Sequence, residues 1–286
     1  MTTSAQPAQR VAVIGSPDKA AVAATMARIQ NWLQSRAEIV FAGITYDSAP
    51  ALTREPDLLF VLGGDGTLIA AVNGLGRQQI PIIGVNLGKL GYLADFTVDE
   101  LEREGDFLFG DHLPITRRIM MDVSIERAGQ PTVHAPAIND CVVTAGRPFH
   151  MIQVTLSVDG DKVAMVRGDG LIVATPSGST AHNLAAGGPI VEPTGEAFIL
   201  TPLCPQALTY RPVVLDARRR IVLRCVQANV GTSVNVDGRV MSVFQHGDQM
   251  VVTRYDADFL LVRNPKRSEW HALRRKLRWG EGPNMH

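Results

Sequence analysis

The chain reads Leu59-Phe60-Val61-Leu62-Gly63-Gly64-Asp65-Gly66-Thr67-Leu68 where an apolar strand signal meets a helix signal. Three glycines surround the single acid of this stretch. Because glycine has no Cβ, backbone amides at such a corner can approach an anion closely. The stretch therefore predicts a strand, a phosphate-accepting turn and a helix, with the Asp65 carboxylate at the mouth of the turn.

The first third of the chain alternates strand and helix signals around this turn. Apolar runs predict strands at Val11–Gly15, Leu58–Leu62 and Ile80–Val85. Apolar residues spaced about 3.6 apart predict helices at Ala20–Leu33 and Thr67–Leu75. Strands separated by helices indicate a parallel sheet, and ligands of such sheets bind at the carboxyl ends of the strands. The glycine turn is expected at that edge.

The character of the sequence changes after Pro114. Short β-like runs follow at Ile115–Ile125, Val133–Val143, Ile152–Val158, Ala164–Arg167, Leu171–Ala174, Val213–Leu215, Ile221–Val226, Met250–Arg254 and Phe259–Val262. Asp-Gly pairs at 159–160 and 237–238 predict hairpins between them. We therefore expect a two-domain α+β protein, with an α/β domain at residues 1–113 and a mostly antiparallel β domain at 114–264. The segment 265–286 reads as a helix that could pack back on the first domain.

Composition restricts the class of protein. The 286 residues are 45% hydrophobic and 20% charged, which is typical of a soluble globular protein. The 28 Lys and Arg balance 28 Asp and Glu, so no positive field favours nucleic acid. No apolar run has the length of a membrane span, and the start lacks the apolar core of a signal peptide. The composition favours a cytoplasmic enzyme with neither nucleic-acid nor membrane partners, whose three cysteines, Cys141, Cys204 and Cys225, are buried thiols.

The glycine turn allows two interpretations. In one it cradles a diphosphate or triphosphate, and Asp65 is a base or a metal-organising acid. In the other it is a plain turn with Thr67 as the helix N-cap. Two glycines before the acid and one after it are more than a plain turn needs, which favours the phosphate-binding interpretation. The chain has no Walker A sequence, and the lack of a Gly-x-Gly-x-x-Gly fingerprint disfavours a Rossmann dehydrogenase.

Two further motifs point to a nucleotide. Asn139-Asp140 could together grip a ribose diol, although an Asn-Asp turn explains the pair equally well. The block Asp169–Pro189 combines glycines, alanines and hydroxyls, which favours a nucleotide-binding loop over a merely well-packed helix. The basic run Arg274-Arg275-Lys276 is interpreted as a solvated helix face.

Taken together these motifs resemble the NAD kinase family. The motifs that carry the resemblance are Gly-Gly-Asp-Gly-Thr at 63–67, Gly-Val-Asn-Leu-Gly-Lys-Leu-Gly-Tyr-Leu at 84–93, Asn-Asp at 139–140, the block at 169–189 and Thr-Pro-Leu-Cys-Pro at 201–205. The resemblance implies a kinase that uses ATP or polyphosphate, with Mg²⁺ or another divalent cation, to phosphorylate the adenosine ribose 2′-hydroxyl of NAD, giving NADP. It also implies a homo-oligomer, a dimer or tetramer, and dinucleotide binding by the β-rich domain.

The resemblance also assigns roles to residues. Asp65 would be the proton acceptor, in a phosphate-binding turn made by Gly63, Gly64, Gly66 and Thr67. The dinucleotide would be held by Asp65, Gly66, Asn139, Asp140, His150, Arg167 and Asp169. The nucleotide pocket would be lined by Thr180, Ala181, His182, Asn183, Leu184 and Ala185. No protein ligand of a metal is assigned.

Two alternatives share parts of this pattern. A lipid or sphingoid kinase has the same glycine-acid corner, but it needs an apolar substrate cleft or a membrane-binding surface, and the sequence shows no basic amphipathic helix with a broad apolar face. A non-catalytic sensor of NAD or NADP would have no use for Asp65. Turnover of NAD with ATP distinguishes all three, because only an NAD kinase makes NADP.

Overall fold

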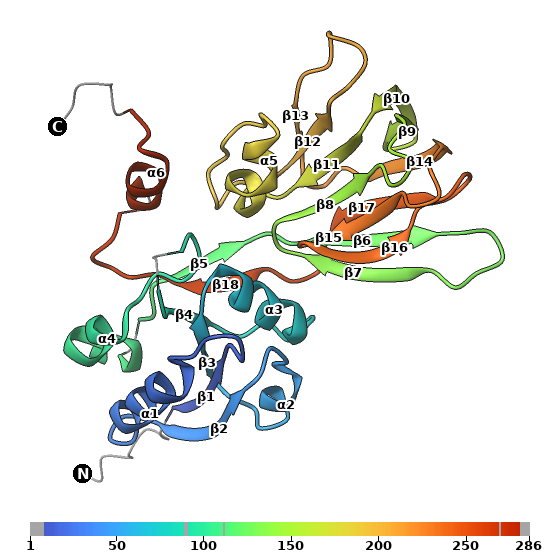
Figure 1. Ribbon diagram of the computed structural model, residues 1–286. Helices are drawn as coiled ribbons and strands as arrows, with labels where there is room; N and C mark the ends of the chain where they lie inside the picture. Colours follow the sequence, from blue (N-terminus) through green and yellow to red (C-terminus); the bar gives the residue numbers. More distant parts are fainter. Residues whose placement is uncertain (1–8, 89–90, 111, 269, 281–286) are drawn as a thin grey trace. The chain divides into compact units, whose positions relative to one another are not determined.

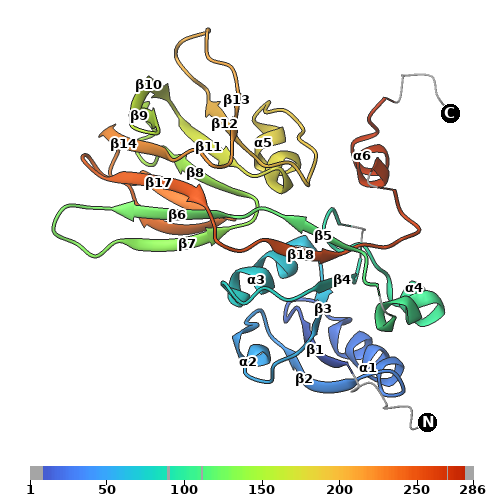
Figure 2. The same ribbon diagram turned by 180° about the vertical axis from the view of Figure 1, so that it is seen from behind.

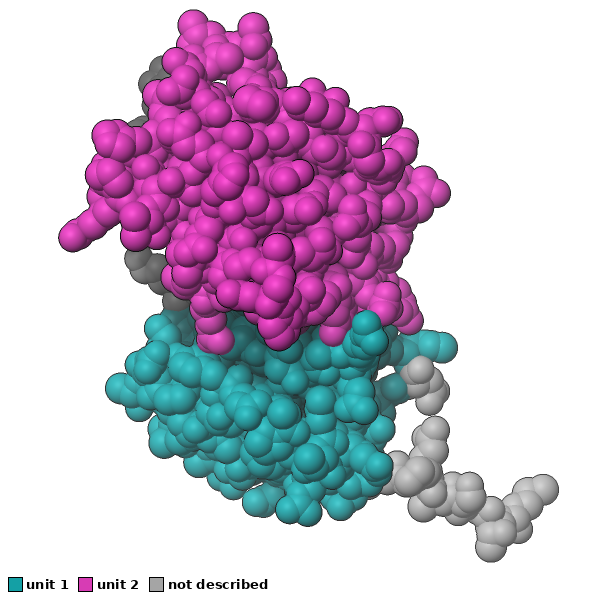
Figure 3. Space-filling view, turned by 90° about the vertical axis from the view of Figure 1, so that its right-hand side faces the viewer, with its two compact units in different colours: residues 1–116, 260–286 teal, residues 117–259 magenta. Residues whose placement is uncertain are grey.

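A computed structural model describes residues 9–88, 91–110, 112–268 and 270–280. The chain divides into two compact units, coloured separately in Figure 3. Unit 1 contains residues 1–116 and 260–286, and unit 2 contains residues 117–259. Among the described residues, no helix combines the length and the apolar character needed to cross a membrane.

Unit 1 is built on a six-stranded sheet in the order β2-β1-β3-β4-β18-β5 (Figure 1). The strands are β1 (Arg10–Gly15), β2 (Glu38–Ile44), β3 (Leu58–Gly63), β4 (Ile82–Asn86), β18 (Phe259–Val262) and β5 (Ile115–Arg118). The helices are α1 (Val22–Leu33), α2 (Ala49–Leu52), α3 (Asp65–Leu75), α4 (Val98–Glu104), the 3₁₀ turn η1 (Gly105–Phe109) and α6 (Trp270–Leu277). Strand β1 pairs in parallel with β2 and β3, and β3 pairs in parallel with β4, so the predicted parallel sheet is confirmed.

The central strands of this sheet are apolar on both faces because both faces are covered. Val13 and Phe60 share one buried cluster with Ile29 of α1. Leu59 points to the opposite face and is also buried. Leu68 of α3 is fully buried and reaches Gly84 of β4, where a Cβ would lie 2.7 Å from its Cδ1.

The order of the strands places the glycine turn at a switch in chain direction. Strand β1 lies between β2 and β3. The chain continues from β1 to β2 on one side of the sheet, and from β3 to β4 on the other side. The carboxyl ends of β1 and β3 are joined by the Ser16 amide, which donates to the Leu62 carbonyl at 2.9 Å. Ligands of open parallel sheets bind at such a point, which here is flanked by Gly63 and Gly64.

Unit 2 consists of two six-stranded antiparallel sheets, whose strands are labelled in Figures 1 and 2. The first, in the order β10-β9-β14-β17-β6-β7, contains β6 (Met121–Glu126), β7 (Val133–Ala137), β9 (Ile152–Val158), β10 (Asp161–Gly168), β14 (Ile221–Gln227) and β17 (Gln249–Arg254). The second, in the order β13-β12-β11-β8-β15-β16, contains β8 (Asp140–Thr144), β11 (Gly170–Ala174), β12 (Ala197–Leu203), β13 (Val213–Asp216), β15 (Ser233–Val236) and β16 (Arg239–Val243). The predicted antiparallel character of this region is confirmed.

Both predicted hairpins are present. Strands β9 and β10 are joined at Asp159-Gly160, and β15 and β16 at Asp237-Gly238. The φ angles are positive at all four positions, 51° and 93° in the first turn and 47° and 77° in the second. This left-handed backbone matches the twist of paired strands, and Asp and Gly tolerate it better than other residues.

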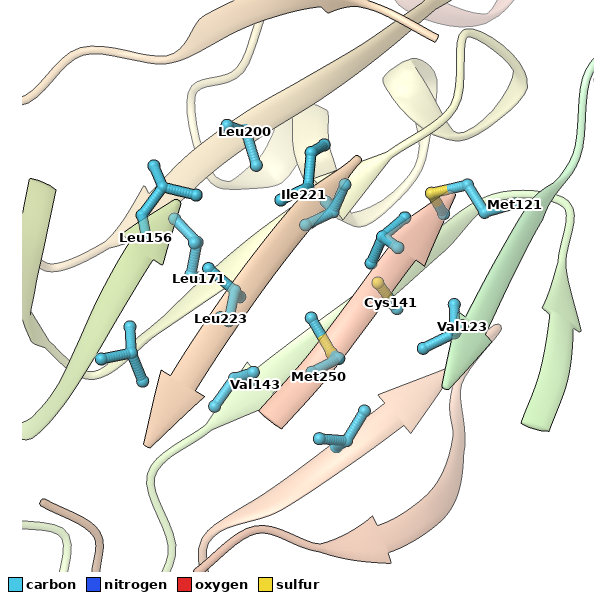
Figure 4. Packing of buried hydrophobic residues seen from close by; sticks show 14 of the residues in the cluster. Met121, Val123, Cys141, Val143, Leu156, Leu171, Leu200, Ile221, Leu223 and Met250 are labelled. Carbon is cyan, nitrogen blue, oxygen red and sulfur yellow. The ribbon is translucent and has the colours of Figure 1, made fainter. Parts of the chain in front are cut away.

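The two sheets of unit 2 share one apolar core, shown in Figure 4. Alternate residues of each strand point into it, among them Cys141 and Val143 of β8 and Leu223 of β14. Burial raises the pKa of the Cys141 thiol well above its usual value. Cys141 and Cys225 are buried as predicted, but Cys204 is exposed and that prediction is wrong. Cys204 follows the end of β12 with a positive φ of 41°, outside the alternation that buries strand residues.

Several boundaries differ from the predictions. Two predicted strands are each divided in the structure. The predicted strand Ile115–Ile125 forms β5 and β6, and the predicted strand Val133–Val143 forms β7 and β8, which are separated by the bend before Asp140. Phe259–Val262, expected among the antiparallel strands, pairs in parallel with β4. The predicted C-terminal helix forms over Trp270–Leu277.

Candidate active site

The glycine turn joins β3 to α3 without a side-chain cap. Gly64 is the N-cap, with extended backbone at φ −115° and ψ −170°, and Asp65 lies in the first turn of the helix. Thr67 lies inside the helix and is buried. The plain-turn alternative, with Thr67 as N-cap, is therefore wrong about the capping residue.

Packing explains one of the three glycines of the turn. A Cβ at Gly63 would lie 2.3 Å from Thr67 Oγ1, so a larger residue does not fit. Among the described residues, no atom lies within 4 Å of a Cβ at Gly64 or Gly66. Glycine inside a helix costs roughly 0.5–1 kcal/mol relative to alanine, so Gly66 is unfavourable for the fold alone. Bare backbone at a helix start suits the close approach of an anion.

The Asp65 carboxylate accepts hydrogen bonds from three consecutive backbone amides. Tyr92 N donates to Oδ2 at 2.7 Å, while Leu93 N and Ala94 N donate to Oδ1 at 2.9 and 3.2 Å. The side chain retains 30% of its exposure. The acid is thus fixed in orientation at the start of α3 and still reachable from solvent.

Gly91 makes this arrangement possible. A Cβ at Gly91 would lie 1.9 Å from Asp65 Oδ1, so the loop can close on the carboxylate only with glycine there. The sequence prediction of the site missed residues 91–94, although Gly91 belongs to the stretch 84–93 that carried the family resemblance. Lys89 and Leu90 of that stretch lie outside the described residues.

Lys276 of α6 lies beside the same carboxylate. Its Nζ is 4.0 Å from Asp65 Oδ2 and 4.3 Å from the centroid of the Tyr92 ring. Burial lowers the pKa of Lys276, and the charge of Asp65 opposes that shift. Arg274, Arg275 and Lys276 are all exposed residues, as a solvated basic face requires, but the side chain of Lys276 is only 27% exposed because it lies beside Asp65 and Tyr92.

In unit 2, Asn139 and Asp140 form the bend between β7 and β8. The bend is held by Asp237, whose carboxylate accepts from the amides of Ile138, Asn139 and Asp140 at 2.9, 2.8 and 3.2 Å. The Asp237 amide in turn donates to the Asp140 carbonyl at 2.9 Å. Asp237 was predicted only as a hairpin residue, and its role in fixing the Asn-Asp pair was missed.

Asp140 is a buried acid beside a second acid. It is 5% exposed, and burial, followed by the charge of Asp237, raises its pKa to about 7. A carboxyl group held in this way accepts a hydrogen bond when ionised and donates one when protonated. Near neutral pH it is therefore able to take either role toward a ligand.

Substitution Asp140→Asn is expected to change the pH dependence of stability. The folded state holds the proton more tightly than the unfolded state, so the wild type loses stability as pH rises from the ordinary Asp value of 3.8 to about 7. Because Asn does not titrate, the variant gains roughly 2–3 kcal/mol relative to wild type between about pH 5 and pH 8. Urea unfolding of both proteins at about pH 5 and pH 8 measures the change in the free energy of unfolding with pH. The same change in wild type and Asp140→Asn would contradict the prediction.

The Gly/Ser/Ala-rich block packs against the same bend. Thr175 N donates to the Asn139 carbonyl at 2.8 Å, and Thr175 Oγ1 donates to the Ile138 carbonyl. Gly178 N donates back to Thr175 Oγ1 at 3.1 Å. The structure therefore brings the Asn-Asp pair and the start of the block together, through η2 (Ser177–Thr180).

Substitution Gly178→Ala is expected to destabilise this contact. A Cβ at Gly178 would lie 2.0 Å from the Asn139 oxygen and 2.4 Å from its carbonyl carbon, and backbone atoms cannot rotate away. The free energy of unfolding should fall by about 1–3 kcal/mol. Gly110→Ala is the matched control, because its Cβ would meet only an ordinary contact at 3.5 Å. Equal unfolding free energies of the two variants would contradict this prediction, because they would show that the bend at Asn139 adjusts to the added Cβ without losing stability.

The six residues predicted to line the nucleotide pocket differ in exposure. They begin with Thr180, the last residue of η2, and include α5 (His182–Ala185). His182 and Ala185 are exposed, while Thr180, Ala181 and Leu184 are half-buried. Asn183 is fully buried, and its amide bonds within the protein, to the Ser179 and Pro189 carbonyls and the Thr201 hydroxyl. Its side chain thus holds α5 on the sheet.

The remaining predicted residues lie at the other end of β11. Ala174 pairs with Asp140, whereas Gly170 pairs with Thr144, and Asp169 precedes Gly170. The five residues of β11 span about 17 Å, so Asp169 is distant from the Asn-Asp bend. The neighbouring Asp169 carboxylate, through hydrogen bonding and its charge, raises the pKa of the Cys204 thiol.

Arg167 and His150 belong to the same end of unit 2. Arg167 lies two residues before Asp169, near the end of β10, and is exposed. His150 is exposed in the loop after β8, where its carbonyl accepts from Asn229 Nδ2 at 2.6 Å. The predicted dinucleotide residues of unit 2 therefore form two groups at opposite ends of β11.

Within the described part of the chain, no three His, Cys, Asp or Glu side chains come together as a metal site. Asp65 is a single carboxylate with most of its lone pairs already engaged. This donor set does not form an all-protein cage. It fits a Mg²⁺ ion that is carried mainly by phosphate oxygens and water.

Comparison with known proteins bears directly on this arrangement. Family profiles for the ATP-NAD kinase N-terminal and C-terminal domains match residues 19–106 and 138–264. An NAD kinase of Rhodopirellula baltica is 36% identical over 94% of this chain and 86% of its own length. An NAD kinase of Trichlorobacter lovleyi is 39% identical over 79% of each chain.

Solved structures share the fold. Yeast NADH kinase, complexed with NADH, superposes with a TM-score of 0.86 over 99% of this chain and 91% of its own, at 21% identity. An NAD kinase from Archaeoglobus fulgidus, in complex with ATP, gives a TM-score of 0.74 over 90% and 95%, at 28% identity. With both domain profiles matched and relatives above one-third identity along most of its length, the chain belongs to the NAD kinase family.

Proposed function

We propose that this protein transfers the terminal phosphoryl group of ATP to the adenosine ribose 2′-hydroxyl of NAD, making NADP. The observation that carries the proposal is the Asp65 carboxylate, held by three amides beside two glycines that packing within the described residues does not require. The names of its relatives support NAD as acceptor, and the ATP complex of the Archaeoglobus fulgidus relative supports ATP as donor.

Asp65 is proposed as the proton acceptor. An ionised carboxylate has about four lone-pair sites, and three of those on Asp65 accept backbone N–H groups. Oδ2 accepts one of these bonds, so it retains a site for the proton of the 2′-hydroxyl. As the 2′-oxygen bonds to the γ-phosphorus, the bond from that phosphorus to the leaving ADP oxygen breaks, and the proton passes to Asp65.

The turn is proposed to bind the transferred phosphoryl group. Helix geometry leaves the first amides of α3 without intrahelical acceptors, and the helix dipole favours negative charge there. Gly63, Gly64, Gly66 and Thr67 supply the turn, and bare backbone at Gly64 and Gly66 lets phosphate oxygens approach. Preorganised donors of this kind stabilise the charge that develops in phosphoryl transfer.

The dinucleotide is proposed to be held mainly by unit 2. Asn139 and Asp140 present an amide and a carboxyl group on a bend fixed by Asp237, which suits a ribose diol. The further ligands proposed are Gly66, His150, Arg167 and Asp169, with Thr180, Ala181, His182, Asn183, Leu184 and Ala185 lining the pocket. Among the last group Asn183 acts by positioning α5, because its amide is engaged within the protein.

A divalent cation is proposed to accompany the donor. When bound, Mg²⁺ would neutralise charge on the phosphates of ATP, and Asp65 would contact it through water, because its remaining lone-pair site is assigned to the 2′-hydroxyl proton. We further propose that the protein is a cytoplasmic homo-oligomer, a dimer or tetramer, without nucleic-acid partners. The balanced charge of the chain supports the proposal that it has no nucleic-acid partners.

The relatives do not support the two alternatives, a lipid or sphingoid kinase and a non-catalytic sensor. Incubation of the purified protein with NAD, ATP and Mg²⁺ tests the proposal, with NADP detected by an NADP-specific dehydrogenase. We expect NADP to accumulate with time and enzyme concentration. Binding of NAD without product from ATP or polyphosphate would favour the sensor and contradict the proposal.

A further inference from the structure

The C-terminal segment is anchored to unit 1 before α6 begins. Arg267 Nη1 donates to the Asp95 carbonyl and lies 3.1 Å from Asp95 Oδ1, while Nη2 lies 2.5 Å from Glu100 Oε1. Asn264 N donates to Asp95 Oδ2 at 3.0 Å. The Arg267 side chain is only 11% exposed. These contacts fix the point from which α6 starts.

Helix α6 places one of its three basic residues at the candidate catalytic acid. Lys276 Nζ lies 4.0 Å from Asp65 Oδ2 and 4.3 Å from the Tyr92 ring centroid. Arg274 and Arg275 share the last turn of α6 and its favourable helix dipole, and all three basic residues are exposed. The helix dipole therefore explains basic residues at this end, but it does not explain why Lys276 alone is turned to Asp65.

The ammonium group of Lys276 has unused donors. At 4.0 Å it is too far from Oδ2 for a hydrogen bond, and among the described residues it donates none. Its position is set by the face of Tyr92, whose own amide binds Asp65. Burial, reinforced by the charge of Asp65, raises the pKa of the Tyr92 phenol, so the ring is neutral beneath the cation. Three N–H donors are thus held beside Oδ2.

We propose that Lys276 is a ligand of the donor phosphates in the phosphoryl-transfer reaction. This inference rests on the proposed function, since it assumes that Oδ2 of Asp65 receives the proton of the attacking hydroxyl. A cation 4.0 Å from that oxygen would be within reach of the phosphoryl group that the hydroxyl attacks. Lys276 keeps its proton and neutralises oxygens of the transferred group, while the new oxygen–phosphorus bond forms and the bond to the leaving phosphate chain breaks.

The proposed ligand chemistry is a chain of linked phosphates, which ATP and inorganic polyphosphate share. A contact to phosphate should affect both donors alike, whereas a contact to adenosine would affect ATP alone. Lys276 is a point charge rather than a planar fork, so arginine should replace it only in part. The test therefore compares methionine and arginine at position 276, and ATP with polyphosphate as donors.

Steady-state kinetics of Lys276→Met, Lys276→Arg and the control Arg275→Met test this role. For Lys276→Met we expect kcat/KM for ATP to fall about tenfold or more, with the Kd for NAD within about twofold of wild type. Lys276→Arg should recover part of the loss, and Arg275→Met should match wild type. An unchanged kcat/KM for ATP in Lys276→Met would overturn the inference, whereas inactivity of the wild type would instead refute the proposed function.

Direct binding separates a ligand from a structural residue. Inorganic tripolyphosphate serves as the probe, and its Kd should rise about tenfold or more in Lys276→Met and stay unchanged in Arg275→Met. Thermal unfolding of the same samples reports folding. Equal binding of tripolyphosphate by wild type and Lys276→Met, or a kinetic loss confined to ATP when polyphosphate is also a donor, would overturn the assignment to phosphate.

Discussion

Asp65→Asn is expected to lower kcat by about 10²–10⁴-fold while the Kd for NAD stays within about twofold. The substitution keeps the shape of the side chain and removes the carboxylate that would receive the 2′-hydroxyl proton. Oδ1 and its bonds from Leu93 and Ala94 can be retained by the asparagine oxygen. The loss should therefore appear in turnover, measured as NADP formed under saturating NAD and ATP.

Asp99→Asn is the control for this substitution. Asp99 is an exposed acid of unit 1 that pairs with Arg28, and its side chain is 76% exposed. We expect wild-type turnover from it. Because an asparagine Nδ2 at position 65 would face the Tyr92 amide, thermal unfolding of Asp65→Asn should be recorded as well. Near-normal turnover by a folded Asp65→Asn would refute the role of Asp65 as proton acceptor.

Asp237→Ala is expected to lower the free energy of unfolding by about 3 kcal/mol or more and to weaken NAD binding. The substitution removes the acceptor of three backbone amides at the bend that carries Asn139 and Asp140. Each partly buried amide left without a partner costs about 1–3 kcal/mol. Denaturant unfolding gives the first quantity and calorimetric titration with NAD gives the second.

Asp159→Ala is a matched control for this prediction. Asp159 occupies the same position of the other Asp-Gly hairpin, and its φ of 51° is close to the 47° of Asp237. Both substitutions therefore place alanine in the same left-handed conformation. The Asp159 carboxylate accepts one backbone amide, from Arg220, and pairs with exposed Arg219. Similar losses of stability in the two variants would mean that the Asp237 contacts add nothing beyond the turn.

The parts of the fold that were predictable from sequence are those whose signals are local. The strand β3 is a run of buried apolar residues that ends in glycine, and the two Asp-Gly turns require a left-handed backbone. Strand β2 was missed although residues 39–44 form an apolar run, so its local signal was present and was not used. Helix α4 was missed because it has only seven residues, although its capping box, Thr97 with Glu100, is a signal that could have revealed it.

The contacts that complete the candidate site were not predictable from local signals. The amides that hold Asp65 come from residues 27–29 positions later, and those bound by Asp237 lie 97–99 positions earlier. Lys276 reaches Asp65 from the C-terminal helix. A backbone amide has no sequence signature, so which loop supplies it depends on tertiary structure. Gly91 is a sequence signal for these contacts, because only glycine at this position lets the loop approach Asp65 closely.

The most direct test of the account is transfer of label from γ-³²P-ATP to NAD in a single turnover. Enzyme in excess of ATP is mixed with saturating NAD and Mg²⁺, and the products are separated and treated with a phosphatase specific for the 2′-phosphate. The account predicts that wild type moves the label into NADP, from which the phosphatase releases it, and that Asp65→Asn leaves it in ATP. Label that remains in ATP or goes to water with the wild type would contradict it.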